Sequence, residues 1–175
     1  MIPSTLRRSL LVILGLPLAA CGYSPFPSSP AVNGTAGPVA EIEFHPLTNA
    51  TFRPVIQAWV NDAVVYRLLR EPRLALRRGG EVGFLLSGTL TQYANEGIGF
   101  DSQDIAKRFR LRITARILLK DKGKGRTLLH HEVVGETYYT AGEGVTATRA
   151  AEQDAATRVV GDLADRILAQ VVGAL

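Results

Sequence analysis

Five cations occupy alternate positions in the segment KRFRLRITARILLK, residues 107–120. Successive side chains of a strand point to opposite faces, so a strand here separates an apolar set from a charged set. The apolar set is Phe109, Leu111, Ile113, Ala115, Ile117 and Leu119, and the charged set is Arg108, Arg110, Arg112, Arg116 and Lys120, with Thr114 and Leu118 among them. Like charges at this spacing repel one another unless an anion or water lies against them. The pattern therefore predicts one face packed on a core and one face that meets anionic groups or solvent.

The other polar clusters do not indicate catalysis. His130 and His131 are adjacent in a predicted strand, so their imidazoles point to opposite faces and cannot readily converge on one metal ion. The run GKGR at 123–126 lacks the Lys-Ser/Thr ending and the helix of a phosphate-binding loop. The acidic loop at 94–104 is more simply a solvated loop than a cation site. No nucleophile has a recognisable base, so we expect no catalytic residue, no metal and no enzymatic activity.

Periodicity predicts the elements that position these residues. A helix begins at Pro54 and ends before Pro72, with Trp59 on its apolar stripe as a core anchor, and a closing helix of about 26 residues begins at Thr146 as N-cap. Apolar runs predict strands near 39–44, 73–77, 83–93, 107–120 and 127–140.

Two helices with one apolar stripe each, and a sheet with one apolar face, fit an α+β two-layer sandwich. Both helices pack on one side of a mostly antiparallel sheet of four to five strands. Residues 39–175 form this single domain. The arrangement turns the arginine face outward, so we expect its partner to lie outside the domain or to be solvent.

The N-terminus predicts export and lipidation. Arg7 and Arg8 precede an apolar stretch at 10–16, which is typical of a signal peptide over residues 1–20 and is too short to cross a bilayer as a helix. It ends in Leu-Ala-Ala-Cys, which resembles the bacterial lipobox, and Cys21 is the only cysteine of the chain. We expect acylation of Cys21, because two or more acyl chains hold a protein stably on a membrane.

The segment after Cys21 predicts where the lipoprotein resides. Gly22 follows the cysteine where sorting signals for the inner membrane have Asp, which indicates the periplasmic side of the outer membrane. Residues 21–38 hold the acylated cysteine and a Pro-rich tether, whose residues 23–38 span up to about 50 Å if extended. Loss of residues 1–20 lowers the formal net charge from +4 to +2, because Arg7 and Arg8 leave with them. This charge gives little reason to expect a nucleic-acid partner.

The chain resembles the lipopolysaccharide-assembly lipoproteins, the LptE family. The resemblance rests on the order of four segments: LAACGY, LTNATFRPVIQAWVNDAVVYRLLREPRLALR, FLLSGTLTQYANEGIGFDSQDIAKRFRLRITARILLKD and YYTAGEGVTATRAAEQDAATRVVGDLADRIL. It implies a non-catalytic outer-membrane lipoprotein that plugs a large β-barrel translocon, assists its assembly and binds lipopolysaccharide on its way to the surface. It also implies two helices on one side of a four-stranded sheet.

The resemblance assigns two positions. A basic residue at the start of the last helix, implicated in lipid recognition, matches Arg149 in TATRAAEQD. A second basic residue of the family falls near Asp101, where this chain has an acid. The arginine face offers anion binding elsewhere, because a guanidinium pairs well with phosphates of lipopolysaccharide and with carboxylates that line a barrel.

An alternative function uses the same tether and a similar domain. A periplasmic scaffold lipoprotein, such as an activator of a cell-wall synthase, must reach across the periplasm. The tether here is short, which favours a partner at the membrane itself.

We predict that Cys21→Ala leaves a precursor that is uncleaved or a product that is released from the membrane. The thiol is the expected site of acylation and lies at the expected cleavage point. Fractionation of outer membranes, with the processed size read from a gel, checks this. Normal processing and attachment of the variant would contradict the lipobox assignment.

Overall fold

The computed structural model describes residues 39–79 and 83–175. The predicted signal peptide, Cys21 and the tether lie outside the described residues. The elements are β1 (Ala40–Phe44), β2 (Thr48–Asn49), α2 (Val55–Arg70), β3 (Leu74–Arg77), β4 (Phe84–Phe100), β5 (Ala106–Asp121), β6 (Arg126–Thr140) and α3 (Val145–Gly173).

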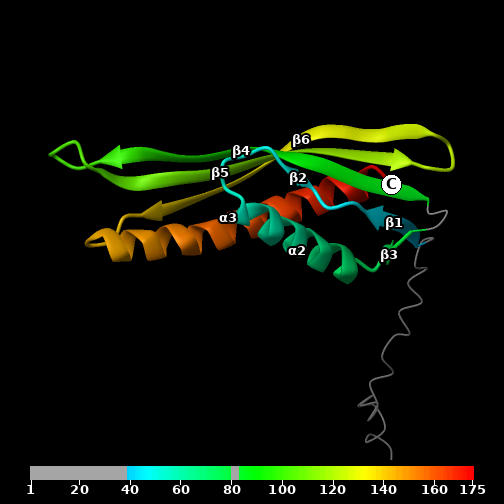
Figure 1. Cartoon of the computed structure of the whole chain (residues 1–175), viewed down its shortest axis with the longest axis horizontal. Coiled ribbons are helices and arrows are strands. Elements are labelled where there is room, and N and C mark those ends of the chain that lie inside the picture. Colours follow the sequence, from blue (N-terminus) through cyan, green and yellow to red (C-terminus); the bar gives the residue numbers. More distant parts are fainter. Residues whose placement is uncertain (1–38, 80–82) are drawn as a thin grey trace, which may run out of the picture. The chain divides into compact units, whose positions relative to one another are not determined.

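The strands form one mixed sheet in the order β3-β1-β4-β5-β6, with β2 beside β4. The long strands β4, β5 and β6 are antiparallel to one another, and β1 is parallel to both of its neighbours. Helices α2 and α3 contact each other and cover one side of the sheet (Figure 1). This confirms the α+β sandwich with both helices on one side, and the parallel pairs of β1 make the sheet mixed.

The core lies between the helices and the predicted apolar face of β5. Residues Leu111, Ile113, Ala115, Ile117 and Leu119 are fully buried, which confirms the period-two pattern of this strand. Helix α2 contributes Ile56, Val60, Val64 and Leu68, and α3 contributes Val159, Leu163, Ile167 and Val171 among others. The burial of alternate residues on β5 fixes its cations on the face away from the helices.

Trp59 is not the core anchor that its place on the apolar stripe predicts. The residues that α2 buries recur at every fourth position from Ile56, and Trp59 lies at the flank of that row with 37% of its surface exposed. The stripe is therefore narrower than the sequence indicates, and the indole is accessible from outside.

Two boundaries also differ from the predictions. Strand β4 continues to Phe100, so the loop expected at 94–104 shrinks to a tight turn that Asp101 closes, with its Oδ1 accepting the N–H groups of Gln103 and Ile105. Helix α3 begins at Val145, and Gly144, not Thr146, is its N-cap. Gly144 has φ +87, a left-handed conformation that glycine adopts without strain, so the chain enters the helix earlier.

Helix α3 crosses β6 at a point where only a glycine fits. A Cβ placed on Gly135 would lie 2.7 Å from Leu163 Cβ and 2.8 Å from the Val159 carbonyl oxygen. These atoms belong to the helix backbone and its first side-chain carbon, so they cannot rotate away. Close packing of α3 on the sheet therefore depends on this position.

We predict that Gly135→Ala lowers the free energy of unfolding by about 1–3 kcal/mol, because the helix must shift away from the sheet. Gly161→Ala is the matched control, since its Cβ would meet only Arg67 Nη2 at 3.7 Å. This helical glycine should give no loss, and a gain of up to about 1 kcal/mol. Urea unfolding followed by circular dichroism measures both, and equal stabilities would contradict the close approach.

Candidate functional site

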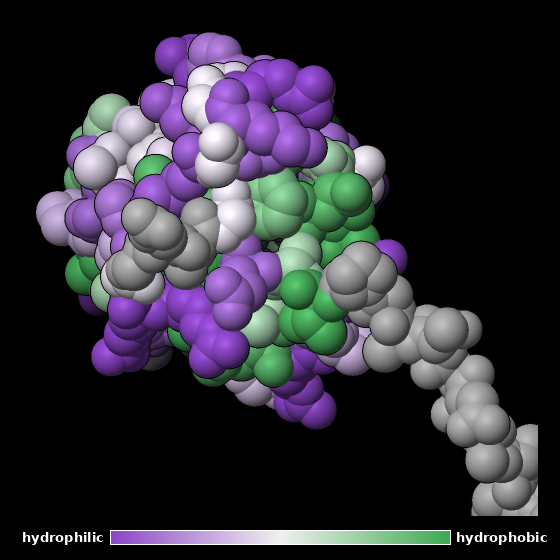
Figure 2. All heavy atoms as spheres, turned by 90° about the vertical axis from the view of Figure 1, so that its right-hand side faces the viewer, coloured by the Kyte–Doolittle hydropathy of each residue, from purple (hydrophilic) through white to green (hydrophobic). Residues whose placement is uncertain are grey.

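Two hollows mark the helix side of the domain, and their charges distinguish them. One, at the end where β1 begins and α3 ends, has a volume of about 590 Å³ and is lined by Val39, Leu74, Phe84, Val172 and Leu175 among others. Apolar side chains gather at this end of the domain (Figure 2). The two charged side chains that line it are paired, Glu41 with Arg77 at 3.2 Å and Arg73 with Glu71 at 2.7 Å.

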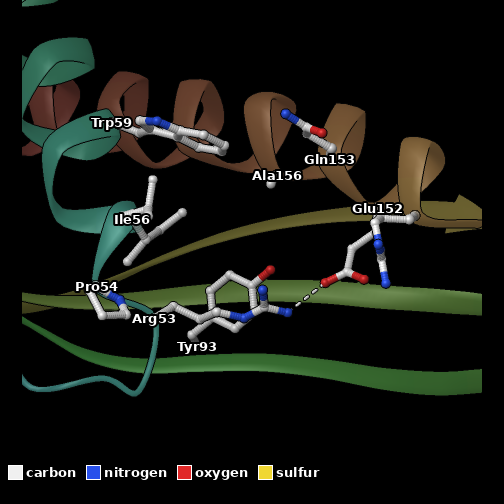
Figure 3. A pocket seen from close by; sticks show the side chains of 10 residues that line it. Arg53, Pro54, Ile56, Trp59, Tyr93, Glu152, Gln153 and Ala156 are labelled. Carbon is white, nitrogen blue, oxygen red and sulfur yellow. Dashed lines mark hydrogen bonds and ion pairs between the residues drawn. The ribbon is translucent and has the colours of Figure 1, made fainter. Parts of the chain in front are cut away.

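The other hollow, the α2–α3 groove, lies where the first turns of α2 and α3 approach β4. It has a volume of about 660 Å³ and is lined by Arg53, Val55, Trp59, Tyr93, Arg149 and Glu152 among others. Figure 3 shows Trp59 and Gln153 at one rim of this groove and Tyr93 with the Arg53–Glu152 pair at the other. The groove combines an indole, apolar side chains and two cations.

Arg53 is held in place by two contacts. Its Nη2 donates to Glu152 Oε1 at 2.7 Å, and its guanidinium carbon lies 5.0 Å from the centre of the Tyr93 ring. Tyr93 is 6% exposed, and burial raises the pKa of its hydroxyl, so the ring is neutral at physiological pH. Arg53 therefore has a fixed position at this rim of the groove, and its charge is compensated by Glu152.

The side chain of Arg149 is exposed and forms no hydrogen bond or ion pair with any of the described residues. The nearby carboxylate that lines the groove, Glu152, is already engaged by Arg53. No side chain caps the first turn of α3, whose backbone N–H groups favour an anion. Within the described part of the chain, Arg149 is thus an uncompensated cation beside an apolar wall.

The opposite side of the sheet, the open face, carries the alternate cations of β5. Two of them pair inside the domain: Arg110 donates to Glu96 of β4, and Arg112 lies 3.2 Å from Glu136 of β6. The expectation that partners lie outside the domain is therefore wrong for Arg110 and Arg112. Strand register explains it, because Glu96 and Glu136 stand directly opposite these arginines.

The ion pairs alter the titration of both carboxylates. The hydrogen bond from Arg110 lowers the pKa of Glu96. The hydroxyl of Tyr138, and after it Arg112, lowers the pKa of Glu136. Both acids therefore remain ionised at physiological pH and keep their arginines engaged.

The remaining cations of the open face, Arg108, Arg116 and Lys120, have no ion-pair partner among residues 39–79 and 83–175. They lie on the opposite side of the sheet from Arg149, because α2 and α3 cover only one side. The structure thus divides the predicted contact residues between two separate surfaces.

The position that departs from the family pattern has a structural role. Asp101 accepts the backbone N–H groups of Gln103 and Ile105 at 2.9 and 3.0 Å and lies 3.5 Å from Lys107. The hydrogen bond from Ile105, followed by that from Gln103, lowers the pKa of Asp101. A carboxylate here closes the β4–β5 turn, which a basic side chain cannot do.

Sequence reasoning missed the groove, because α2 and α3 start far apart in the chain. The signal that was present is Trp59, a large aromatic residue at the flank of an apolar stripe. In the described ranges, no group of three or more His, Cys, Asp or Glu side chains is placed to hold a metal ion. No helix among these residues combines the length and the apolar character that crossing a membrane requires.

Comparison with known proteins identifies relatives by family and by fold. Residues 39–171 match the model of the LptE family, described as lipopolysaccharide-assembly. No curated protein matches the chain by sequence.

Similar solved structures share the fold at low identity. Rare lipoprotein B from Shewanella oneidensis has 10% identity and a TM-score of 0.51, over 76% of this chain and 94% of that chain. Uncharacterized lipoprotein B from Nitrosomonas europaea has 13% identity and a TM-score of 0.54, over 77% and 83%. A minor lipoprotein from Acinetobacter baumannii has 13% identity and a TM-score of 0.51, over 77% and 94%.

Proposed function

Because the chain belongs to the LptE family of lipopolysaccharide-assembly proteins, we propose that it is an outer-membrane lipoprotein that binds lipopolysaccharide. In this function it plugs the lipopolysaccharide translocon β-barrel, assists the assembly of that barrel and is anchored through acylated Cys21. The family is non-enzymatic, so the function requires binding and no catalytic step. The observation that supports lipid binding most directly is the uncompensated charge of Arg149 in the α2–α3 groove.

The chemistry of the groove suits an acylated, phosphorylated glycolipid. Arg149 provides a charge-assisted hydrogen bond for a phosphate, and the uncapped start of α3 adds backbone donors. Val55 is 62% exposed and Trp59 37%, which gives sugar faces or acyl chains an apolar surface next to that charge. An anionic amphiphile can bind to both the charge of Arg149 and the apolar surface, whereas a purely polar ion can bind only to the charge.

The open face suits a different partner, the wall of the barrel. Arg108, Arg116 and Lys120 form no ion pair with a described residue of the domain, although Glu132 stands opposite Arg116 in register. Carboxylates that line a barrel lumen would complement these side chains. The two surfaces lie on opposite sides of the sheet, so one molecule can engage lipid and barrel together.

We predict that Arg149→Ala weakens lipopolysaccharide binding about tenfold or more, since a hydrogen bond to a charged group contributes about 1.5–3 kcal/mol. Arg149→Lys separates two forms of recognition: recovery with Lys indicates simple charge, and loss with both indicates a bidentate contact. Binding of purified lipopolysaccharide and permeability of the outer membrane in cells are the measurements.

Arg78→Ala is the matched control for this series, because Arg78 is exposed, has no partner among the described residues and does not line the groove. It should bind lipopolysaccharide as the native chain does. Normal binding by Arg149→Ala would remove Arg149 from the site.

We predict that the triple reversal Arg108→Glu, Arg116→Glu and Lys120→Glu spares folding and weakens capture of the barrel. These cations have no ion pairs to lose within the described domain, and only Arg116 stands opposite a carboxylate, the exposed Glu132. Reversal of Arg110 and Arg112 would instead break two ion pairs and face both Glu96 and Glu136 with like charge. Circular dichroism checks the fold. A pull-down from detergent-solubilised outer membranes checks the partner, read as a heat-modifiable barrel band.

Two outcomes of that pull-down would contradict the proposal. Capture of the barrel at native strength by the triple variant would mean that the open face is merely solvated. Copurification of the native protein with a cell-wall synthase in place of a barrel would favour the scaffold function.

A further inference from the structure

Strand β6 is the rim of the sheet, with β5 on its inner side and no strand of the described domain on its outer side (Figure 1). An edge strand of 15 residues presents a row of backbone N–H and C=O groups to its surroundings. Proteins usually protect such rows with charged side chains, proline, bulges or a covering helix. Strand β6 is protected in this way along only part of its length.

Half of the rim is covered by α3. The backbone N–H of Glu136 donates to Asp162 Oδ2 at 2.9 Å, and the carbonyl of Tyr138 accepts from Arg158 at 3.3 Å. On the inner side, the N–H of Ala141 donates to the Lys107 carbonyl at 2.8 Å. From Leu129 to the end of the strand, even-numbered residues therefore turn their backbone groups outward, and odd-numbered residues turn theirs towards β5.

The first half of the rim is open. By the same alternation His130, Glu132 and Val134 turn their backbone groups outward, and none of them finds a hydrogen-bond partner among the described residues. Helix α3 leaves the rim here, because it crosses β6 at Gly135. His130, His131 and Glu132 are exposed, and the stretch from 128 to 134 contains neither proline nor lysine. Its one charged side chain besides the histidines is Glu132, and the register shift between β5 and β6 places a bulge at its start, at Leu128. This stretch, the open rim, is available for pairing with another strand.

The open rim has the sequence Leu-Leu-His-His-Glu-Val-Val, and two copies of it are complementary to each other when they lie antiparallel. Antiparallel pairing with an identical strand, centred on residue 131, sets His130 opposite glutamate and each leucine opposite a valine. The pairs are His130 with Glu132, Leu128 with Val134 and Leu129 with Val133, each occurring twice, and His131 with its own counterpart on the axis. Shifting the register by two residues places Glu132 opposite another glutamate or His130 opposite another histidine, which removes this match.

We propose that the open rim, Leu128–Val134, pairs antiparallel with the open rim of a second copy of this chain, around a twofold axis at His131. The outward groups of His130, Glu132 and Val134 then complete hydrogen bonds with the partner strand, and the two sheets join into one. The α3 contacts at Glu136 and Tyr138 end the paired stretch and so set its length. The pairing uses neither the α2–α3 groove nor the cations of β5, so it does not rest on the proposed function, and it concerns the chain outside a barrel.

Cysteine cross-linking of the full-length chain tests this geometry. Residues on the axis form a non-hydrogen-bonded pair with Cα atoms about 4.5 Å apart, within disulfide range. For His131→Cys we expect a disulfide-linked dimer on a non-reducing gel, without added cross-linker. His130→Cys is the matched control, because its two copies would lie about 8–9 Å apart, beyond disulfide range.

The expected result is a dimer band at least about tenfold stronger for His131→Cys than for His130→Cys, given the steep geometric requirement of a disulfide. The native chain, whose only cysteine is Cys21, gives the background. Equal bands for the two variants, no dimer above background, or a cross-link of His131→Cys to a different protein would each overturn the proposal.

A second pair of variants tests the backbone bonds. Glu132→Pro removes an N–H that faces away from β5, a position where an edge strand tolerates proline, so circular dichroism should show the native fold. Glu132→Ala keeps that N–H. Analytical ultracentrifugation in detergent should show a dimer for Glu132→Ala and a large shift to monomer for folded Glu132→Pro. A native chain that is monomeric at every concentration, or a dimer that withstands the proline, would overturn the proposal.

Discussion

Burial of one face of β5 is the constraint on which the rest of the domain depends. This strand lies between β4 and β6, and its alternate apolar side chains from Leu111 to Leu119 are fully buried under the helices. Because strand side chains alternate, enclosing one set obliges the arginines and Lys120 to occupy the other side of the sheet. A shift of register by one residue would move every cation of β5 into the core, at a cost that no ion pair offsets. The charged surface is thus a direct result of how the core forms.

The same alternation explains why much of the fold could be predicted from sequence. The apolar periods of β5, α2 and α3 are long and regular, and they correctly indicate two helices on one side of a sheet. The pairing of Arg110 with Glu96 and of Arg112 with Glu136 depends on the register between strands, which single-strand patterns do not contain. The groove required knowledge of how α2 and α3 meet. Trp59 was misplaced because a stripe drawn from hydrophobicity is wider than the row of side chains that the helix buries.

The two candidate surfaces differ in how their charges are balanced. On the open face, Glu96 and Glu136 pair with two neighbouring arginines, and the cations on either side of them have no ion-pair partner among the described residues. In the groove, Glu152 neutralises Arg53, and the charge of Arg149 remains. In both places an internal ion pair fixes the side chains around it, and a neighbouring cation has no ion pair with the described residues. This arrangement limits repulsion in the free protein and retains charge for a partner.

The bond between Arg53 and Glu152 also bears on the order in which the domain forms. It joins residues 99 positions apart, whereas the β4–β5–β6 meander is built from neighbours along the chain. Contacts between distant segments require costly loop closure, so locally connected hairpins tend to form sooner. The groove exists only after α3 has docked beside α2. The chain consequently acquires this groove at completion of folding, and a partially folded chain lacks it.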